Sequence, residues 1–148
     1  MDKEKIIGLI PAAGIGSRLN LPFPKELYPT LKNNNYKPIS NYVVDYLILA
    51  GVKHIVFVIN ESKHQLIGYF GSGKNFGCSF SYVVQDKISN FQSSSPGLAD
   101  ALISAYHLIK NKIVFFGMAD TMMSPKNVFQ IGMKKLLSGS DLTLCLFP

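Results

Sequence analysis

Residues Ile6 to Leu19 read IIGLIPAAGIGSRL, and the interpretation of the whole chain starts from this stretch. The apolar run Ile6 to Ile10 predicts a buried strand, which ends in a turn of small residues. Gly14 and Gly16 can adopt positive φ and let a ligand lie against bare backbone, and Arg18 supplies a rigid fork of donors. A strand followed by such a turn is suited to binding a phosphate group.

The composition of the 148-residue chain indicates one globular domain rather than a disordered segment. Hydrophobic residues make up 47% of the chain and charged residues 16%, which favours a well-buried sheet. The formal net charge is +6, but the lysines are scattered and no basic stripe with interleaved aromatic residues occurs. We therefore expect a small polyanionic ligand and no nucleic acid.

Other features of the sequence narrow the class of protein. The N-terminus is charged and no apolar run reaches the roughly 20 residues of a membrane helix, so we expect no secretory signal and no membrane partner. Cys78 and Cys145 are isolated, which is typical of reduced thiols in a cytoplasmic protein. The three histidines show no zinc-ligand spacing.

Strand-like and helix-like segments alternate along the chain. After the first strand, the pattern predicts strands at residues 54–60, 79–85, 112–117 and 141–147, helices at residues 40–50, 62–70 and 97–109, and a further helix with Ser124 as its cap and Pro125 in its first turn. A polar turn is expected at residues 33–35 and a surface loop at residues 86–96. Five strands separated by helices predict a three-layer α/β domain with a mostly parallel sheet. Ligands of such sheets bind beyond the carboxyl ends of the strands, where the glycine-rich turn lies.

Two groups of side chains receive simple structural assignments. The helix that begins at Gly97 is expected to have one apolar face, formed by Leu98, Leu102, Ile103, Tyr106 and Ile109. Four carboxylates are expected to be exposed charges without a role in a site, namely Glu26, Asp45, Asp86 and Asp100.

Two glycine-containing segments of the chain match known phosphate-binding motifs only in part. Residues 14–19, GIGSRL, begin like a dinucleotide fingerprint, but Leu19 stands where the third glycine should be. Residues 68–75, GYFGSGKN, nearly match a P-loop, but they lack the final Ser or Thr and precede a strand instead of following one. We interpret residues 68–75 as a turn.

A third interpretation is a family resemblance that spans residues 6 to about 123. Residues 11–19 (PAAGIGSRL), 24–29 (PKELYP) and 37–39 (KPI) resemble the nucleoside triphosphate signature of sugar-1-phosphate nucleotidyltransferases, especially the glucose-1-phosphate uridylyl- and thymidylyltransferases. Three further matches follow in the same order, at residues 49–52 (LAGV), at residues 96–101 (PGLADA), and at Asp120 after an apolar segment. The combination is more specific than any glycine pattern alone.

The resemblance implies a Rossmann-like nucleotidyltransferase fold in which residues 1–148 form the nucleotide-binding domain. It implies transfer of a nucleoside monophosphate from UTP or dTTP to a sugar 1-phosphate, with Mg²⁺ as cofactor and pyrophosphate as the leaving group. By matching position, Arg18 would neutralise the departing pyrophosphate, Lys25 would contact the α-phosphate, and Asp120 would bind Mg²⁺. The nucleotide would be bound by Pro11, Ala12, Ala13, Gly14, Ile15, Gly16, Ser17, Gln85 and Gly97.

Several alternatives remain open at this point. The residue that contacts the base would be Gln85 by its position at a strand end, or Gln92 by its spacing of five residues from Gly97. The loop from Arg18 to Lys25 is shorter than in the glucose-1-phosphate enzymes, so cytidylyl transfer to a phosphorylated alcohol is an alternative.

The family also implies a second half. Its members continue for about another domain, which carries most of the sugar-phosphate pocket. The chain is therefore expected to be a C-terminally truncated fragment of a longer enzyme, or else a non-catalytic nucleotide-binding or regulatory module. An exposed sheet edge at residues 141–147 would favour a homo-oligomer or pairing with the absent part.

Overall fold

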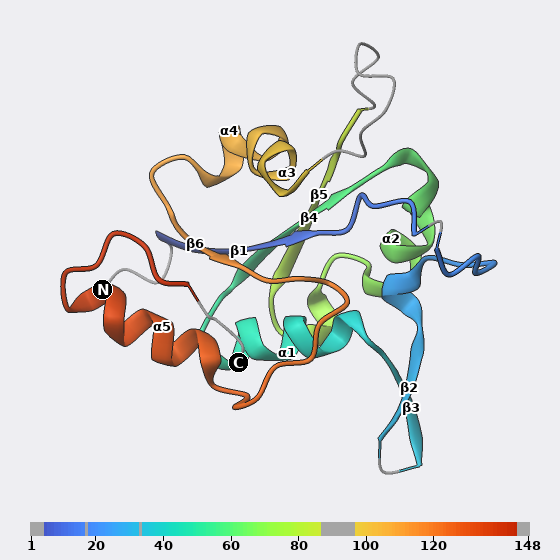
Figure 1. Ribbon diagram of the computed structural model, residues 1–148, viewed down its shortest axis with the longest axis horizontal. Coiled ribbons are helices and arrows are strands. Elements are labelled where there is room, and N and C mark those ends of the chain that lie inside the picture. The colour runs from blue at the N-terminus through green and yellow to red at the C-terminus, as the bar shows by residue number, and fades with distance from the viewer. Residues whose placement is uncertain (1–4, 17, 33, 87–96, 145–148) are drawn as a thin grey trace.

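The computed structural model describes residues 5–16, 18–32, 34–86 and 97–144. Within these residues, the centre of the molecule is a sheet of four parallel strands in the order β5-β4-β1-β6 (Figure 1). The strands are β1 (Ile6–Pro11), β4 (His54–Ile59), β5 (Ser79–Val84) and β6 (Ile113–Phe116). The first four predicted strands and the parallel sheet are thus confirmed.

Helices cover both faces of this sheet and produce the three predicted layers (Figure 1). On one face lie α3 (Leu98–Ser104) and α4 (Tyr106–Ile109), and on the other lie α1 (Ser40–Leu49), α2 (His64–Phe70) and α5 (Val128–Leu137). Three single-turn helices fill the connections, namely η2 (Lys25–Leu27), η3 (Glu61–Lys63) and η4 (Lys74–Phe76). The helices predicted at residues 40–50 and 62–70 are confirmed as α1 and as η3 followed by α2.

The sheet separates two hydrophobic cores because successive strand residues point to opposite faces. On the α1 side, Ile10 and Phe57 pack with Leu47. On the α3 side, Leu9 and Val58 pack with other buried residues, among them Ala101 and Ala105. Strands that are buried on both faces read as continuous apolar runs, which is why the sequence revealed them so clearly.

A β-hairpin projects from this body (Figure 1) and was not predicted as strands. It consists of β2 (Pro29–Lys32) and β3 (Asn35–Pro38), paired antiparallel with Leu31 opposite Tyr36. Only its turn was expected, and Asn34 has the positive φ of 59° that such a turn needs. The strands escaped notice because both are short, exposed and bounded by proline, so they show no alternating apolar pattern.

The strand predicted at residues 141–147 is wrong for the part that the structure describes. Residues 141–144 form no strand, and Leu142 and Leu144 are 72% and 70% exposed. Their alternation with polar residues resembles a strand pattern, but no neighbouring strand in the described ranges pairs with them. Residues 145–147 lie outside the described ranges.

The two later helix predictions also need correction. Leu98, Leu102, Ile103 and Tyr106 are exposed, whereas the small residues Ala101 and Ala105 face the sheet together with Ile109. The predicted helix over residues 97–109 is also interrupted at Ala105, which separates α3 from α4. The last helix begins at Val128 instead of Pro125, which lies in the preceding turn and accepts the Val128 N–H at 3.2 Å.

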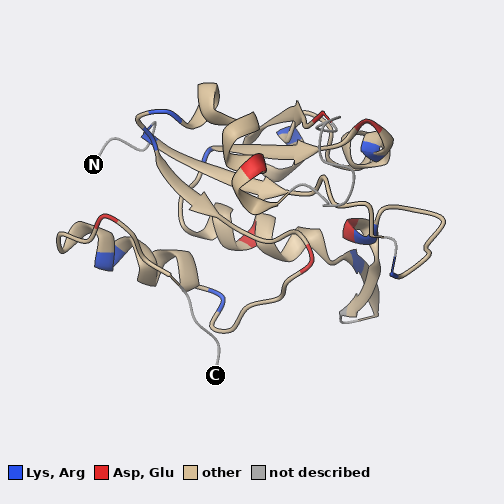
Figure 2. Cartoon of the chain, turned by 45° about the horizontal axis from the view of Figure 1, so that its top comes forward, with Lys and Arg blue, Asp and Glu red and all other residues tan. Residues whose placement is uncertain are grey.

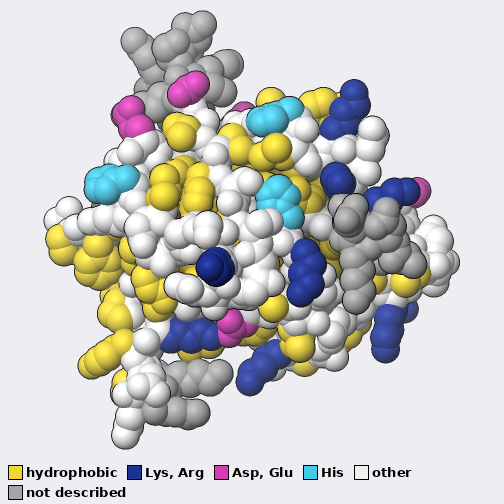
Figure 3. Space-filling view, turned by 180° about the vertical axis from the view of Figure 1, so that it is seen from behind, with side chains coloured by type: hydrophobic (Ala, Val, Ile, Leu, Met, Phe, Trp, Pro, Cys, Tyr) yellow, Lys and Arg dark blue, Asp and Glu magenta, His cyan; other side chains and the backbone are white. Residues whose placement is uncertain are grey.

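Charged residues are spread along the described part of the chain, as the sequence suggested (Figure 2). On the face shown in Figure 3, the basic side chains are largely separated by uncharged surface. The described helices include none that is long and apolar enough to cross a bilayer.

Candidate functional site

A pocket of about 120 Å³ lies beyond the carboxyl ends of the parallel strands, where this class of sheet binds ligands. It brings together segments that are far apart in the sequence. Its lining consists of Pro11, Ala12, Ala13, Gly14, Lys25, Glu26, Gln85, Gly97, Leu98, Ala101, Met118, Ala119 and Asp120. Eight of the residues predicted from the sequence therefore meet in one place: Pro11, Ala12, Ala13, Gly14, Lys25, Gln85, Gly97 and Asp120.

The glycine-rich turn is anchored to β4, the neighbour of β1 in the sheet. The Ala12 N–H donates to the carbonyl of Val58 at 2.7 Å, and the side chain of Asn60 donates to the carbonyl of Ala13 at 2.6 Å. Asn60 follows β4 directly and was not singled out in the sequence, because nothing local shows that its amide reaches back to residue 13. The turn is thereby held with its exposed Gly14 at the pocket.

Gly16 requires the left-handed conformation, with φ of 70°. A Cβ atom at Gly16 would lie 3.6 Å from the aliphatic stem of Lys25, so this lysine packs against the turn. Ile15 is 68% exposed, and neither residue lines the pocket. Ser17 lies outside the described residues. Arg18 is exposed at the outer end of the turn and makes no ion pair within the described part of the chain.

Lys25 and Asp120 form an ion pair at the mouth of the pocket. Lys25 Nζ lies 2.6 Å from Asp120 Oδ2, and the two side chains are 28% and 35% exposed. Lys25 belongs to η2, and Asp120 follows β6, so the pair joins segments that are 95 positions apart. The sequence assigned both residues to one site but did not predict that they bond to each other.

Glu26 is buried, contrary to its prediction as an exposed charge. Its side chain is 1% exposed and accepts a hydrogen bond from Nζ of Lys63, itself 3% exposed, at 2.5 Å. A carboxylate can be buried in this way only when it is paired, and its partner lies 37 positions away in η3. The backbone carbonyl of Glu26 also accepts from Ser40 Oγ at 2.6 Å. These contacts fix η2, and so fix the backbone of Lys25.

The other three carboxylates agree better with the prediction. Asp45 is half exposed and paired with Lys37, and Asp86 is exposed. Asp100 accepts a hydrogen bond from the Gly97 N–H at 2.6 Å, which caps the start of α3 at the pocket.

Gln85 follows β5 directly and is one of the residues that line the pocket. Only 7% of the residue is exposed, and its Nε2 has no hydrogen-bond partner within the described residues. A buried donor without a partner is costly, so such a group in a pocket indicates a ligand acceptor. The alternative, Gln92, lies outside the described residues.

The donor set fits a metal ion only if that ion brings ligands of its own. No group of three His, Cys, Asp or Glu side chains in the described ranges could hold a metal by itself. Two carboxylates line the pocket, and both are paired with a lysine. Asp120 is partly exposed and can be reached, whereas Glu26 is buried. One carboxylate together with phosphate oxygens is the arrangement that Mg²⁺ favours in nucleotide sites.

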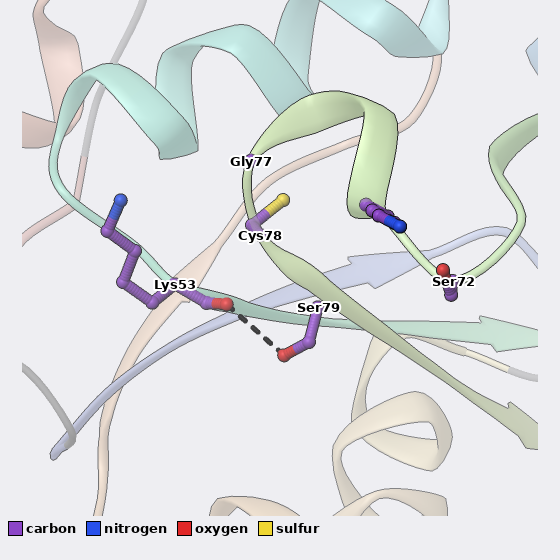
Figure 4. A pocket seen from close by; sticks show the side chains of 6 residues that line it. Lys53, Ser72, Gly77, Cys78 and Ser79 are labelled. Carbon is purple, nitrogen blue, oxygen red and sulfur yellow. Dashed lines mark hydrogen bonds between the residues drawn. The ribbon is translucent and has the colours of Figure 1, made fainter.

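A larger hollow, of about 450 Å³, lies at the amino ends of β4 and β5 and contains none of the predicted site residues (Figure 4). It is lined by Lys53, Ser72, Lys74, Gly77, Cys78 and Ser79. Of residues 68–75, the near P-loop, 68–70 end α2, 71–73 form a turn as predicted, and 74–75 belong to η4. Burial raises the pKa of the Cys78 thiol, although nearby Lys53 acts in the opposite direction, so no reactive thiolate is expected there. We therefore place the candidate site at the smaller pocket.

The fold and the pocket define a Rossmann-like α/β domain of the nucleotidyltransferase type. The model of the nucleotidyl transferase family matches residues 7–136, and the chain belongs to that family. A protein of Methanocaldococcus jannaschii assigned as a UTP–glucose-1-phosphate uridylyltransferase is 30% identical over 138 residues, which cover 81% of this chain and 47% of that protein.

Two solved structures are similar to the chain. One is a Bacillus anthracis protein assigned as a glucose-1-phosphate thymidylyltransferase, in complex with sucrose, with a TM-score of 0.71, 25% identity and coverage of 88% of this chain and 50% of that chain. The other is a UDP-glucose pyrophosphorylase complexed with UDP-glucose, with a TM-score of 0.66, 27% identity and coverage of 90% and 53%. The chain thus spans about half the length of these relatives.

Proposed function

We propose that residues 1–148 form a nucleotide-binding domain whose pocket holds a pyrimidine nucleoside triphosphate, UTP or dTTP. In the reaction, an oxygen of a sugar 1-phosphate attacks the α-phosphorus while the bond from that phosphorus to the β-phosphate oxygen breaks. The products are a nucleoside diphosphate sugar and pyrophosphate. Membership of the nucleotidyl transferase family and the named activities of the relatives support this proposal.

The observation that carries the proposal is the buried amide of Gln85, which has a donor without a partner in the pocket lining. A pyrimidine offers ring and carbonyl acceptors to such a donor. Pro11, Ala12 and Ala13 would present backbone groups beside the base, and Gly97 would let the ligand approach the backbone closely.

The phosphates would extend from this pocket along the glycine-rich turn. Gly14, Ile15, Gly16 and Ser17 would supply the turn, Lys25 would contact the α-phosphate, and Arg18 would neutralise the departing pyrophosphate. Phosphoryl transfer depends mainly on positioning and on charge stabilisation, and these residue types provide both. The exposure of Arg18 fits a residue that acts on a group at the solvent side.

Asp120 would be the carboxylate ligand of Mg²⁺. When bound, Mg²⁺ would offset the negative charge of the phosphates and of the leaving pyrophosphate. Asp120 would hold the metal–nucleotide complex at the end of β6, and Lys25 would turn to the phosphate. The cytoplasmic location and a homo-oligomer remain predictions; the free thiol of Cys78 is consistent with a reducing compartment.

A nucleotide-binding module without transfer activity is the second candidate. The chain spans about half the length of the relatives with named activities, and the pocket described here accounts only for the nucleotide. Both candidates share the same binding step.

Calorimetric titration of the chain with UTP, dTTP, CTP and ATP, each with MgCl₂, tests that step. We expect the pyrimidine nucleotides to bind more tightly than ATP. Folded protein that binds none of the four nucleotides would contradict both candidates. Release of pyrophosphate from UTP with glucose 1-phosphate would support transfer, and tight binding without release would support the module.

A further inference from the structure

We propose that Lys25 makes the pocket selective for a divalent metal that arrives bound to a nucleotide. In the empty site the Lys25 ammonium stays paired with the Asp120 carboxylate, and it leaves that carboxylate only when a phosphate binds it. The proposal rests on the function proposed above and concerns how the site discriminates free metal ions from metal–nucleotide complexes. It assigns Lys25 a specificity role in the empty site, in addition to any contact with the α-phosphate.

The geometry of the pair carries the inference. Lys25 Nζ lies 2.6 Å from Asp120 Oδ2 in a partly buried position, so the carboxylate already has a close positive partner. The lysine is not a freely moving surface side chain. Its stem packs against Gly16, and the next residue, Glu26, is held by Lys63 and Ser40. The ammonium is therefore kept near Asp120 by the fold.

The charges that line the pocket also support a role of Lys25 in excluding free metal ions. Two carboxylates line it, and each has its own lysine: Glu26 pairs with Lys63, and Asp120 pairs with Lys25. A free divalent ion meets no uncompensated negative charge there and must compete with an ammonium that is already in place. Only one of the two pairs is partly exposed and can be opened without unfolding, namely Lys25 with Asp120.

A nucleoside triphosphate changes this balance because it brings several negative charges into the pocket. The triphosphate as a whole offers Lys25 more negative charge than a single carboxylate does, and Asp120 is then free to bind the metal that the phosphates carry. Nucleotide and metal thus assist each other, and this coupling must be reciprocal. Removing the positive charge of Lys25 should have opposite effects on the two ligands: tighter binding of free metal and weaker binding of nucleotide.

Mn²⁺ alone, without nucleotide, is the probe for the test. We expect the Lys25→Met chain to bind Mn²⁺ at least about fivefold more tightly than the wild type, a typical lower value for coupling between sites. Paramagnetic broadening of the Ala119 and Asp120 amide signals would place the ion at this carboxylate. In the Lys25→Met, Asp120→Asn double variant the gain should vanish. A Lys134→Met chain, altered in an exposed lysine of α5, is the matched control and should behave like the wild type.

Unchanged or weaker Mn²⁺ binding by Lys25→Met would overturn the proposal, and so would a gain that survives in the double variant. Lys25→Gln replaces Lys25→Met if the latter has a lowered melting temperature, and the same direction is expected. A merely structural role of Lys25 would weaken the binding of both ligands, whereas the proposal requires opposite changes. The Mn²⁺ measurement contains no nucleotide, so it tests the hold of Lys25 on Asp120 separately. Failure of UTP to bind the wild type is a different result, and it would contradict the proposed function on which this inference rests.

Discussion

The carboxylate of Glu26 accepts a hydrogen bond from the ammonium of Lys63 at 2.5 Å, and both side chains are almost completely buried. This pair ties η2, which carries Lys25, to η3 at the end of β4. A buried pair of this kind contributes little net stability relative to an apolar pair, but either partner alone is a buried charge without compensation. The pair therefore defines how η2 is fixed beside the pocket.

Removing one partner of this pair should destabilise the protein strongly. We expect Lys63→Met or Glu26→Gln to lower the free energy of unfolding by about 3–5 kcal/mol, because the remaining group loses its partner in a buried place. The double variant Glu26→Met, Lys63→Met should regain most of that loss. Urea denaturation followed by circular dichroism measures all three. Equal, additive losses in the double variant would show that the pairing is unimportant.

Gln85→Met should weaken the binding of UTP without lowering the stability of the ligand-free protein. The substitution removes a buried donor that has no partner in the described residues, so the ligand-free protein should keep its stability or gain up to about 2 kcal/mol. Its affinity for UTP should fall at least roughly tenfold, because the ligand loses that donor. Calorimetry and thermal unfolding provide the two measurements. Gln65→Met, which alters an exposed residue of α2, is the control and should change neither.

Arg18→Ala should weaken nucleotide binding without affecting the fold. Arg18 is exposed and makes no ion pair in the described ranges, so the unfolding free energy should change by less than about 0.5 kcal/mol. The loss of a charged contact to phosphate should reduce UTP affinity roughly 10- to 100-fold. A variant that unfolds, or one that binds UTP as tightly as the wild type, would remove Arg18 from the site.

His54 should make the protein less stable in mild acid. Burial, and to a smaller degree the charge of Lys112, lower the pKa of His54 below its ordinary value of 6.5, and its Nε2 lies 2.8 Å from Ser81 Oγ. The unfolded chain therefore takes up a proton as the pH falls through about 6.5, while the folded protein does not, and stability decreases. Urea denaturation at pH 7.5 and 5.5 should show a smaller loss for His54→Gln than for the wild type. An equal loss in both proteins would contradict this assignment.

Much of the fold could be predicted because short stretches of sequence mark the strands and the ends of the helices. The strands are continuous apolar runs, and the ends of α1 and α2 are marked by polar or glycine residues. The grouping of Ala12, Lys25, Gln85 and Asp120 was expected from the family resemblance, and it agrees with the rule that ligands bind beyond the carboxyl ends of parallel strands. The roles of the individual site residues remain predictions.

The errors arise where distant contacts decide the outcome. Glu26 looks like any surface charge until Lys63 is brought beside it. The apolar face of the helix predicted at residues 97–109 was assigned mainly to large residues, but Ala101, Ala105 and Ile109 are the ones buried against the sheet. Asn60 has no local signal for its bond to Ala13. In each case the decisive partner lies far along the chain, so a local pattern could not reveal it.

The most direct test of the account is a titration of the ¹⁵N-labelled chain with UTP and MgCl₂, followed by two-dimensional NMR. We predict saturable shifts of the backbone amides of Ala12, Ala13, Gly14 and Gly97 and of the side-chain amide of Gln85, with the signals of Ser72 and Ser79 unchanged. Folded protein whose pocket signals do not move at millimolar UTP, or whose shifts are confined to the hollow around Ser72 and Ser79, would contradict the central claim.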